Sequence, residues 1–345
     1  MNRRRFLQSA AAATTAAAFT PWPVRAQAKP LRFADMHSHT GILRNSTLTR
    51  EMMTKNGMQL LARKIVADAP VTRGISGRIQ AVRAAVPGEL ARYLDDRIAR
   101  LHAQHKEEQI AEIVSVETLD RAIAAGEPAA VIASEGGDGL EGDLKRLEAA
   151  RASGLVHLQI VHYRVSEVGD ISTERPEYNG LSAFGKDLVT ACNRLGILVD
   201  VAHGTSAVIG QVLDLSAKPV IYSHGHVTSA EPYFTQNVIR ARAIHKPLAE
   251  KIAKKGGVVG LWPLGSQFHS LDAYADALID MAGSLGAAHV GIGSDMFGLP
   301  SSVINDYEAY PALEEILAKR RVAAADIEGI LGRNYLRVLR QSLAS

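Results

Sequence analysis

The chain has 345 residues, of which 47% are hydrophobic and 22% charged; this excludes a disordered protein, because enough apolar side chain is present to form a core. The single cysteine, Cys192, excludes an intrachain disulfide and a thiolate metal cluster, whereas 12 histidines and 36 carboxylates allow a histidine–carboxylate metal site. The formal charge of +3 comes from the arginines of residues 1–28, and the nearly balanced remainder gives no electrostatic reason to expect nucleic acid or an anionic membrane as a partner.

Residues 1–28 are typical of a signal peptide: a basic start, a weakly apolar stretch of alanine and threonine, and the small-x-small cleavage site Ala26-Gln27-Ala28. Arg3-Arg4, followed two residues later by Phe6-Leu7, resembles the twin-arginine export signal. The alternative, an anchor helix, is disfavoured because the apolar stretch is too short to span a bilayer. We therefore expect export by the twin-arginine route to the periplasm or the cell exterior, with no stable membrane anchor. The mature part, residues 29–345, is expected to form one domain.

Short apolar runs, hydrophobic on both faces as buried parallel strands are, alternate with helical patterns along the mature chain. These predicted strands are residues 31–36, 129–134, 155–161, 197–202, 219–223, 257–262 and 289–293. A weaker candidate, residues 78–86, would make eight, and an apolar stripe at Leu90, Leu94, Ile98 and Leu101 predicts a helix after it. This alternation predicts a (β/α)₈ barrel of the TIM type. A doubly wound open sheet is the alternative, but no G-x-G-x-x-G follows the first strand.

The ends of six predicted strands carry residues that can bind a metal. In chain order they are His37 and His39, Glu135, His162, His203, His224 and Asp295. Active sites of such barrels lie at the carboxyl ends of the strands. Residues two apart on an extended segment point to the same side, so His37 and His39 can both reach one ion. A lone histidine is more often structural, but this joint placement predicts a metal site with zinc-type ligands, in which a carboxylate can bridge two ions about 3.5–4 Å apart.

The chain resembles the membrane dipeptidase (renal dipeptidase) family, peptidase family M19, of the amidohydrolase superfamily. The resemblance rests on residues 35–39, 131–137, 158–162, 194–203, 219–224, 291–295 and 330–337, in family order. These segments run from about residue 31 to 340, and the ordered set is far more specific than any one of them.

The resemblance implies a TIM-type barrel of the metal-dependent hydrolase (amidohydrolase) type with two zinc ions per chain. His37 and His39 would bind the first zinc, Glu135 would bridge both, and His203 and His224 would bind the second. Only the resemblance to the family implies which residue binds which ion.

The same resemblance assigns the catalytic and substrate-binding residues. His162 would lie against the substrate carbonyl oxygen, and Asp295 would transfer the proton. Arg242 would bind the terminal carboxylate of the substrate, with Arg240 as the neighbouring alternative.

Three positions and one segment depart from the family pattern. The first strand has His37-x-His39 where the family usually has His-x-Asp, Asp138 stands where a histidine is common, and Phe297 replaces an acid. Residues 78–86 lack the aromatic character of the family's second strand. These departures leave the reaction class intact and the substrate open.

The expected function is that of an exported zinc dipeptidase that hydrolyses small dipeptides by a metal-bound hydroxide. The alternative is another metal-dependent amidohydrolase on the same scaffold, namely a lactamase, an N-acyl amino acid deacylase or a phosphoesterase. A non-catalytic metal-containing binding protein is disfavoured, because a binder has no need of a proton shuttle at Asp295. The expected partner is a small dipeptide substrate, and the sequence leaves a homodimer open.

Overall fold

The computed structural model describes residues 32–44, 46–230 and 237–344. The expected signal peptide, residues 1–28, lies outside the described residues, as does the first residue of the predicted strand 31–36. Among the residues described, no helix has both the length and the apolar character needed to cross a membrane.

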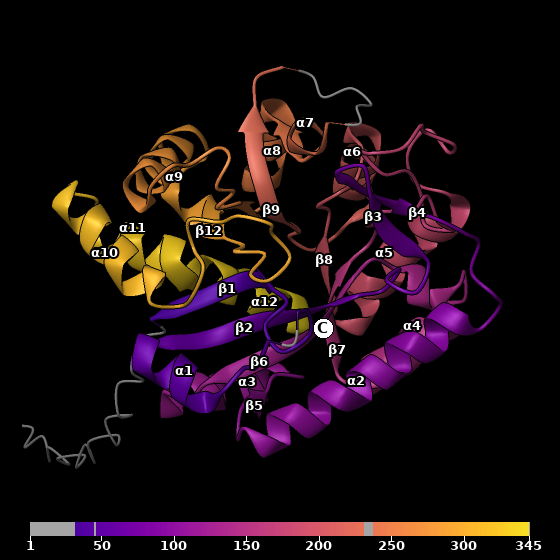
Figure 1. Ribbon diagram of the computed structural model, residues 1–345, viewed down its shortest axis with the longest axis horizontal. Coiled ribbons are helices and arrows are strands. Elements are labelled where there is room, and N and C mark those ends of the chain that lie inside the picture. The colour runs from indigo at the N-terminus through magenta and orange to yellow at the C-terminus, as the bar shows by residue number, and fades with distance from the viewer. Residues whose placement is uncertain (1–31, 45, 231–236, 345) are drawn as a thin grey trace, which may run out of the picture.

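A sheet of eight parallel strands forms the centre of the molecule (Figure 1). In spatial order the strands are β1 (Phe33–Ser38), β2 (Met58–Val66), β6 (Ala129–Glu135), β7 (Leu155–Gln159), β8 (Leu198–Asp200), β9 (Ile221–Thr228), β11 (Val258–Leu261) and β12 (Val290–Ile292), with β5 (Ala111–Glu112) beside β6 and β10 (Ala243–His245) beside β9. The two ends of the path meet: the backbone N–H of Asp295 donates to the carbonyl of His37 at 2.9 Å, and that of His39 donates to Met296 at 3.0 Å. The sheet is thus nearly closed into a TIM-type barrel, which confirms the predicted fold class.

The second barrel strand is β2, so the prediction that residues 78–86 fill this place was wrong. Residues Arg78–Ala81 form β4, which pairs antiparallel with β3 (Thr72–Ile75). This hairpin is a separate two-stranded sheet that follows β2 and lies outside the barrel (Figure 1).

Strand β2 was not predicted from the sequence because Arg63 and Lys64 interrupt its apolar run. Both side chains are nonetheless buried. The Arg63 guanidinium donates to the carbonyl of Thr40 at 3.1 Å, and Lys64 Nζ lies 2.8 Å from Asp200 Oδ2 inside the barrel. A charged residue whose partners are distant in the sequence can be buried although the local hydrophobic pattern does not predict a buried strand.

Helices cover the outside of the barrel, and several begin at residues whose side chains cap them. They are α1 (Arg50–Asn56), α2 (Glu89–Glu107), α3 (Val116–Ala125), α4 (Leu144–Ala152), α5 (Ala183–Leu195), α6 (Ser206–Leu215), α7 (Val238–Ala241), α8 (Lys246–Lys254), α9 (Leu271–Leu285), α10 (Ala309–Lys319), α11 (Ala324–Glu328) and α12 (Asn334–Leu343), with short turns η1 (Asp138–Leu140), η2 (Ala287–His289) and η3 (Gly329–Arg333). The hydroxyls of Ser182, Thr205 and Ser270 accept backbone N–H groups at the starts of α5, α6 and α9. Such caps satisfy donors that have no partner within the helix.

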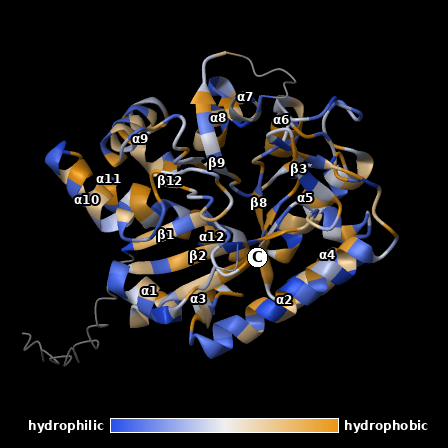
Figure 2. Ribbon diagram, viewed as in Figure 1, coloured by the Kyte–Doolittle hydropathy of each residue, from blue (hydrophilic) through white to orange (hydrophobic). Residues whose placement is uncertain are grey.

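Helix α2 shows how an amphipathic pattern becomes a packed surface. The predicted stripe of Leu90, Leu94, Ile98 and Leu101 is buried, as expected. In Figure 2 the helix alternates hydrophobic and hydrophilic residues along its length, whereas the central strands are mostly hydrophobic. The alternation matches a helix that has one face on the barrel and one in solvent.

Helix α12 closes the end of the barrel at which the strands begin. Tyr335, Val338 and Leu339 of α12 form one buried cluster with residues from the first half of several strands, such as Ala34 of β1 and Leu60 of β2. The carboxyl ends of the strands lie at the opposite end, and there the predicted site residues are found.

Candidate metal centre and active site

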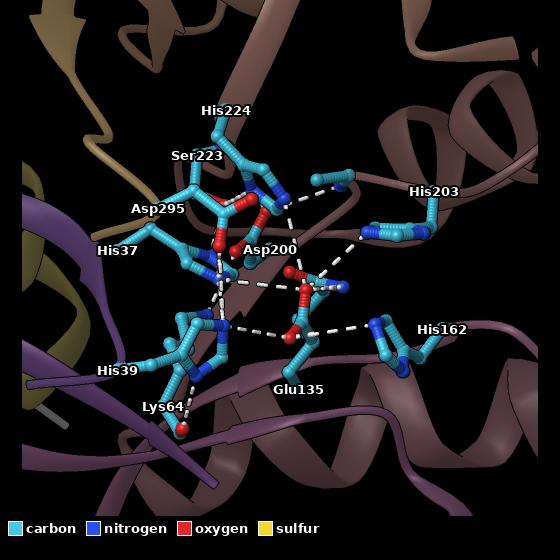
Figure 3. Close-up of polar contacts among 12 residues, drawn as sticks. His37, His39, Lys64, Glu135, His162, Asp200, His203, Ser223, His224 and Asp295 are labelled. Carbon is cyan, nitrogen blue, oxygen red and sulfur yellow. Dashed lines mark hydrogen bonds and ion pairs between the residues drawn. The ribbon is translucent and has the colours of Figure 1, made fainter. Parts of the chain in front are cut away.

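All the predicted site residues gather at the carboxyl ends of the barrel strands (Figure 3). They are His37 on β1 and His39 just after it, Glu135 at the end of β6, His162 after β7, His203 after β8, His224 on β9, Arg242 before β10 and Asp295 after β12. Their exposed fractions run from 0% for His37 and His224 to 8% for Asp295. Side chains from six strands are therefore largely shielded from solvent at this end of the barrel.

Glu135 lies at the centre of this group. Its Oε1 is 3.4 Å from His37 Nε2, 3.3 Å from His203 Nε2 and 3.6 Å from His224 Nε2. Its Oε2 is 3.3 Å from His39 Nε2. Burial alone would raise the pKa of Glu135, but the charges of nearby histidines hold it well below its usual range, so the carboxylate is ionised.

The spacing of these donor atoms fits metal binding. Two ligand atoms that each lie about 2.1 Å from one tetrahedral ion are about 3.4 Å apart. His37 Nε2 and His39 Nε2 are 3.3 Å apart, and both lie at similar distances from the Glu135 carboxylate. His203 and His224 form a second set with the same carboxylate. These two sets share only Glu135, which is the arrangement that a bridging ligand requires. A third candidate set, His37, His224 and Asp295, takes one histidine from each of them.

Hydrogen bonds on the far side of the rings point the Nε2 atoms inward. His39 Nδ1 donates to the carbonyl of Lys64 at 2.8 Å, which leaves the lone pair of a neutral ring on Nε2. The hydroxyl of Ser223 lies 3.2 Å from His37 Nδ1 and 2.8 Å from His224 Nδ1. Asp200 Oδ1 in turn accepts the backbone N–H of Ser223. The departure His39 thus meets the geometric requirement for a ligand although the family usually has a carboxylate there.

Asp295 is held next to the first donor set. Its Oδ1 lies 3.2 Å from His39 Nε2, and its Oδ2 accepts the indole N–H of Trp262 at 3.1 Å. Gly298 leaves room for the carboxylate, because a Cβ at that position would lie 2.1 Å from Asp295 Oδ1. Asp295 has a φ of 49° and His203 a φ of 68°, the left-handed region that non-glycine residues seldom adopt. Such strain is typical of residues whose position serves a site.

Arg242 reaches the second donor set. Its guanidinium contacts Nε2 of both His203 and His224 and lies 5.0 Å from the ring centre of Trp262. Its Nε is buried without a hydrogen-bond partner in the part of the chain that the structure describes. A cation bound by His203 and His224 would use the lone pairs that the guanidinium now faces, so the two compete for this set. Arg240, the neighbouring alternative, is exposed.

Asp68 belongs to the site but was missed by the sequence reasoning. It lies two residues after β2, is fully buried, and its Oδ1 is 2.8 Å from His162 Nδ1. Its Oδ2 accepts the backbone N–H of Tyr163 at 3.0 Å. Burial alone would lower the pKa of His162, but the charges of Asp68 and Glu135 raise it. The rule of polar residues at strand ends would have found Asp68 if residues 58–66 had been identified as the second strand.

The site opens into a cavity of about 610 Å³. His39, Glu135, His162, Arg242 and Asp295 are at its base. Its walls come from the β3–β4 hairpin on one side and from the segments after β11 and β12 on the other. This volume is in the range of pockets that bind small molecules, about 300–1,000 Å³.

Residues 38–344 match the family model described as membrane dipeptidase (peptidase family M19). The match covers most of the chain, and the protein belongs to this family.

Among curated proteins, the chain is 26% identical to Dipeptidase tcpJ of Claviceps purpurea over 230 residues, which are 64% of this chain and 52% of that protein. It is 27% identical to human Dipeptidase 3 over 259 residues, 71% of this chain and 50% of that protein. The chain thus spans about half the length of the curated relatives it matches.

Solved structures of related proteins share the fold. The dipeptidase AC, a metallopeptidase of family M19, superposes with a TM-score of 0.76 at 19% identity, over 92% of this chain and all of that one. A metallopeptidase from Rhodobacter sphaeroides, solved with a phosphinate mimic of the dipeptide L-Ala-D-Ala, gives a TM-score of 0.73 at 19% identity, over 91% of this chain and 100% of that one.

Proposed function

We propose that this protein is an exported, zinc-dependent dipeptidase that holds two zinc ions per chain. The observation that carries the proposal is the pair of donor sets that share the Glu135 carboxylate and open into one cavity with Asp295 and Arg242. Membership of the M19 family supports the reaction class. When bound there, two divalent cations would supply an activated water and a Lewis acid for amide hydrolysis.

Asp295 is the proton carrier in this proposal. Its carboxylate lies at the cavity base beside His39, and the Trp262 indole fixes one of its oxygens. The other oxygen, Oδ1, faces His39 Nε2 and would accept a proton from the attacking water and pass it to the leaving amine. A positioned general base of this kind typically contributes about 10²–10⁴-fold in rate.

His162 stabilises the oxygen of the substrate carbonyl. Because Asp68 accepts from Nδ1 and raises the pKa of the ring, Nε2 can also carry a hydrogen. Nε2 lies 3.4 Å from Glu135 Oε2 at the base of the cavity, where it would donate to the substrate oxygen. A donor that is already oriented costs little reorganisation when negative charge develops on the oxygen.

Arg242 binds the terminal carboxylate of the dipeptide. The guanidinium is buried and contacts aromatic and imidazole rings, and its charge favours an anionic ligand. The planar donor fork of arginine matches the two oxygens of a carboxylate better than the single ammonium group of lysine does. Substrate carboxylate would also draw the guanidinium away from the rings of His203 and His224.

Metal analysis and a substrate panel test the proposal together. Purified protein should contain about two zinc ions per chain, and Glu135→Gln should lose metal because a neutral amide bridges two cations poorly. Free dipeptides should be hydrolysed, whereas an N-acetyl amino acid, a lactam and a phosphodiester should not. Hydrolysis of one of these three in place of the dipeptides would select the corresponding alternative enzyme, and metal-loaded protein that hydrolyses nothing would favour a binding protein.

Export rests on residues 1–28 alone. Replacing Arg3 and Arg4 by lysine should hold the protein in the cytoplasm, and the exported protein should begin at Lys29. Normal export of the double variant would refute the twin-arginine route.

A further inference from the structure

One wall of the cavity is apolar. Trp262, Leu264 and Leu299 form a hydrophobic cluster separate from the barrel core, and all three line the cavity. Each is 4–6% exposed. Apolar residues that line a cavity next to convergent polar groups are typical of a pocket that selects its ligand by shape.

This wall is rigidly attached to the reacting groups. The backbone N–H of Leu299 donates to the carbonyl of Asp295 at 3.2 Å, and the segments after β11 and β12 are joined by a bridge between Leu264 and Ser302. The Trp262 indole donates to Asp295 while its ring lies against the guanidinium of Arg242. Trp262 therefore contacts both Asp295 and Arg242. In the proposed function these two side chains bind opposite ends of the C-terminal residue of the substrate.

The C-terminal residue of a dipeptide has its amine nitrogen at the scissile bond and its carboxylate at the other end. With the nitrogen at Asp295 and the carboxylate at Arg242, the Cα between them would lie beside Trp262, which contacts both groups. Its side chain would then have Leu264 and Leu299 as neighbours. A charged side chain in this place would lose its hydration without gaining a partner from the three wall residues.

Resting on the proposed function, we infer that Trp262, Leu264 and Leu299 form the specificity pocket for the C-terminal residue, and that the enzyme selects dipeptides with a large apolar residue at that position. In this arrangement the N-terminal residue would lie toward the hairpin, which contributes Thr72 and Ile79 to the cavity lining.

The test compares two series of dipeptides, Ala-X and X-Ala, with X as Gly, Leu, Phe, Asp or Lys. For the zinc-loaded enzyme we expect kcat/KM of Ala-Leu and Ala-Phe to exceed that of Ala-Gly by about tenfold or more, the typical discrimination of a hydrophobic pocket. Ala-Asp and Ala-Lys should be poor substrates. The X-Ala series should show a smaller spread.

Variants locate the pocket. Leu299→Ala and Leu264→Ala should each reduce the ratio of kcat/KM for Ala-Leu over Ala-Gly, and Leu264→Asp should shift the preference toward Ala-Lys. Because the ratio compares two substrates on one preparation, loss of folded protein cancels. Leu215→Ala on α6, where the leucine is 42% exposed, is the matched control and should leave the ratio unchanged.

The outcomes separate the two claims. Hydrolysis of dipeptides with an Ala-Leu to Ala-Gly ratio within about threefold of one, or a ratio that neither leucine variant changes, would overturn the pocket and leave the dipeptidase intact. Absence of hydrolysis across both series would overturn the dipeptidase and the pocket with it.

Discussion

The two ends of the barrel are built on the same strands but differ in chemistry. Where the strands begin, Ala34, Leu60 and other apolar side chains pack against Tyr335 and Leu339 of α12. Where they end, ionisable side chains crowd around Glu135, and two of them stand on left-handed backbone. At the first end, burial of apolar side chains stabilises the fold. At the second end, buried charges and strained backbone reduce the stability of the fold.

This difference predicts whether a substitution changes mainly the folding free energy or mainly the reaction rate. At the end closed by α12, a lost side chain should cost folding free energy and leave catalysis by each folded molecule unchanged. At the open end, a lost functional group should cost rate and leave stability nearly unchanged. Four predictions test this contrast.

The largest effect is expected for Asp295→Asn. The amide keeps the size of the side chain but cannot accept the proton, so kcat should fall by about 10²–10⁴-fold. Zinc content and Tm should stay near the wild-type values. Asp214→Asn, at an exposed ion pair on α6, is the matched control. A kcat within about threefold of wild type would refute the role of Asp295 as base, because a general base is expected to contribute about 10²–10⁴-fold.

Leu339→Ala should give the opposite pattern. The side chain is fully buried between α12 and the strand starts, so its removal should cost about 2–5 kcal/mol of unfolding free energy. Denaturant titration measures this loss, with Leu215→Ala as the exposed control. A change of kcat per folded molecule comparable to the change in stability would show that the two ends are not independent.

Asp68→Asn tests whether a residue without contact to the metal ligands sets the rate through His162. Loss of a charge-assisted hydrogen bond should lower kcat about tenfold with little change in KM. Asp68→Glu should recover part of the rate, and Tm should report any structural damage separately. A rise of KM alone would instead place Asp68 in substrate binding.

The last prediction concerns Asp138, at a position where the family resemblance leads us to expect a histidine. It is fully buried, its Oδ1 accepts from Arg164 Nε at 2.8 Å, and its Oδ2 has no partner among the described residues. Burial and the neighbouring Asp68 raise its pKa from 3.8 to about 7. Between about pH 4 and 7 the folded state therefore keeps a proton that the unfolded state has released.

Wild-type stability should accordingly fall, relative to Asp138→Asn, as the pH rises through this window, by about 1.4 kcal/mol per pH unit at most. Unfolding of both proteins at pH 5, 6 and 7 measures the difference. A difference that is constant with pH would show that Asp138 is ionised throughout.

The sequence was sufficient for most of the barrel because its strands are buried on both faces. Residues 129–134 and 155–161 read as apolar runs and coincide with β6 and β7 to within two residues at either end. It failed at β2 because Arg63 and Lys64 are buried through partners far away in the chain, such as Asp200. Without that strand, the hairpin residues 78–86 were assigned to the barrel.

For the site, the sequence alone indicated the polar residues at the strand ends, among them His37, Glu135 and His224. The carboxyl ends of parallel strands meet at one edge of the sheet whatever the details of packing. Only the tertiary structure decided that Asp68 orients His162, that Lys64 supplies the carbonyl that turns His39 inward, and that Arg242 lies against the second donor set. These contacts join residues 25 or more positions apart. Distances of that kind depend on how the chain closes on itself, and no local pattern of residue types contains them.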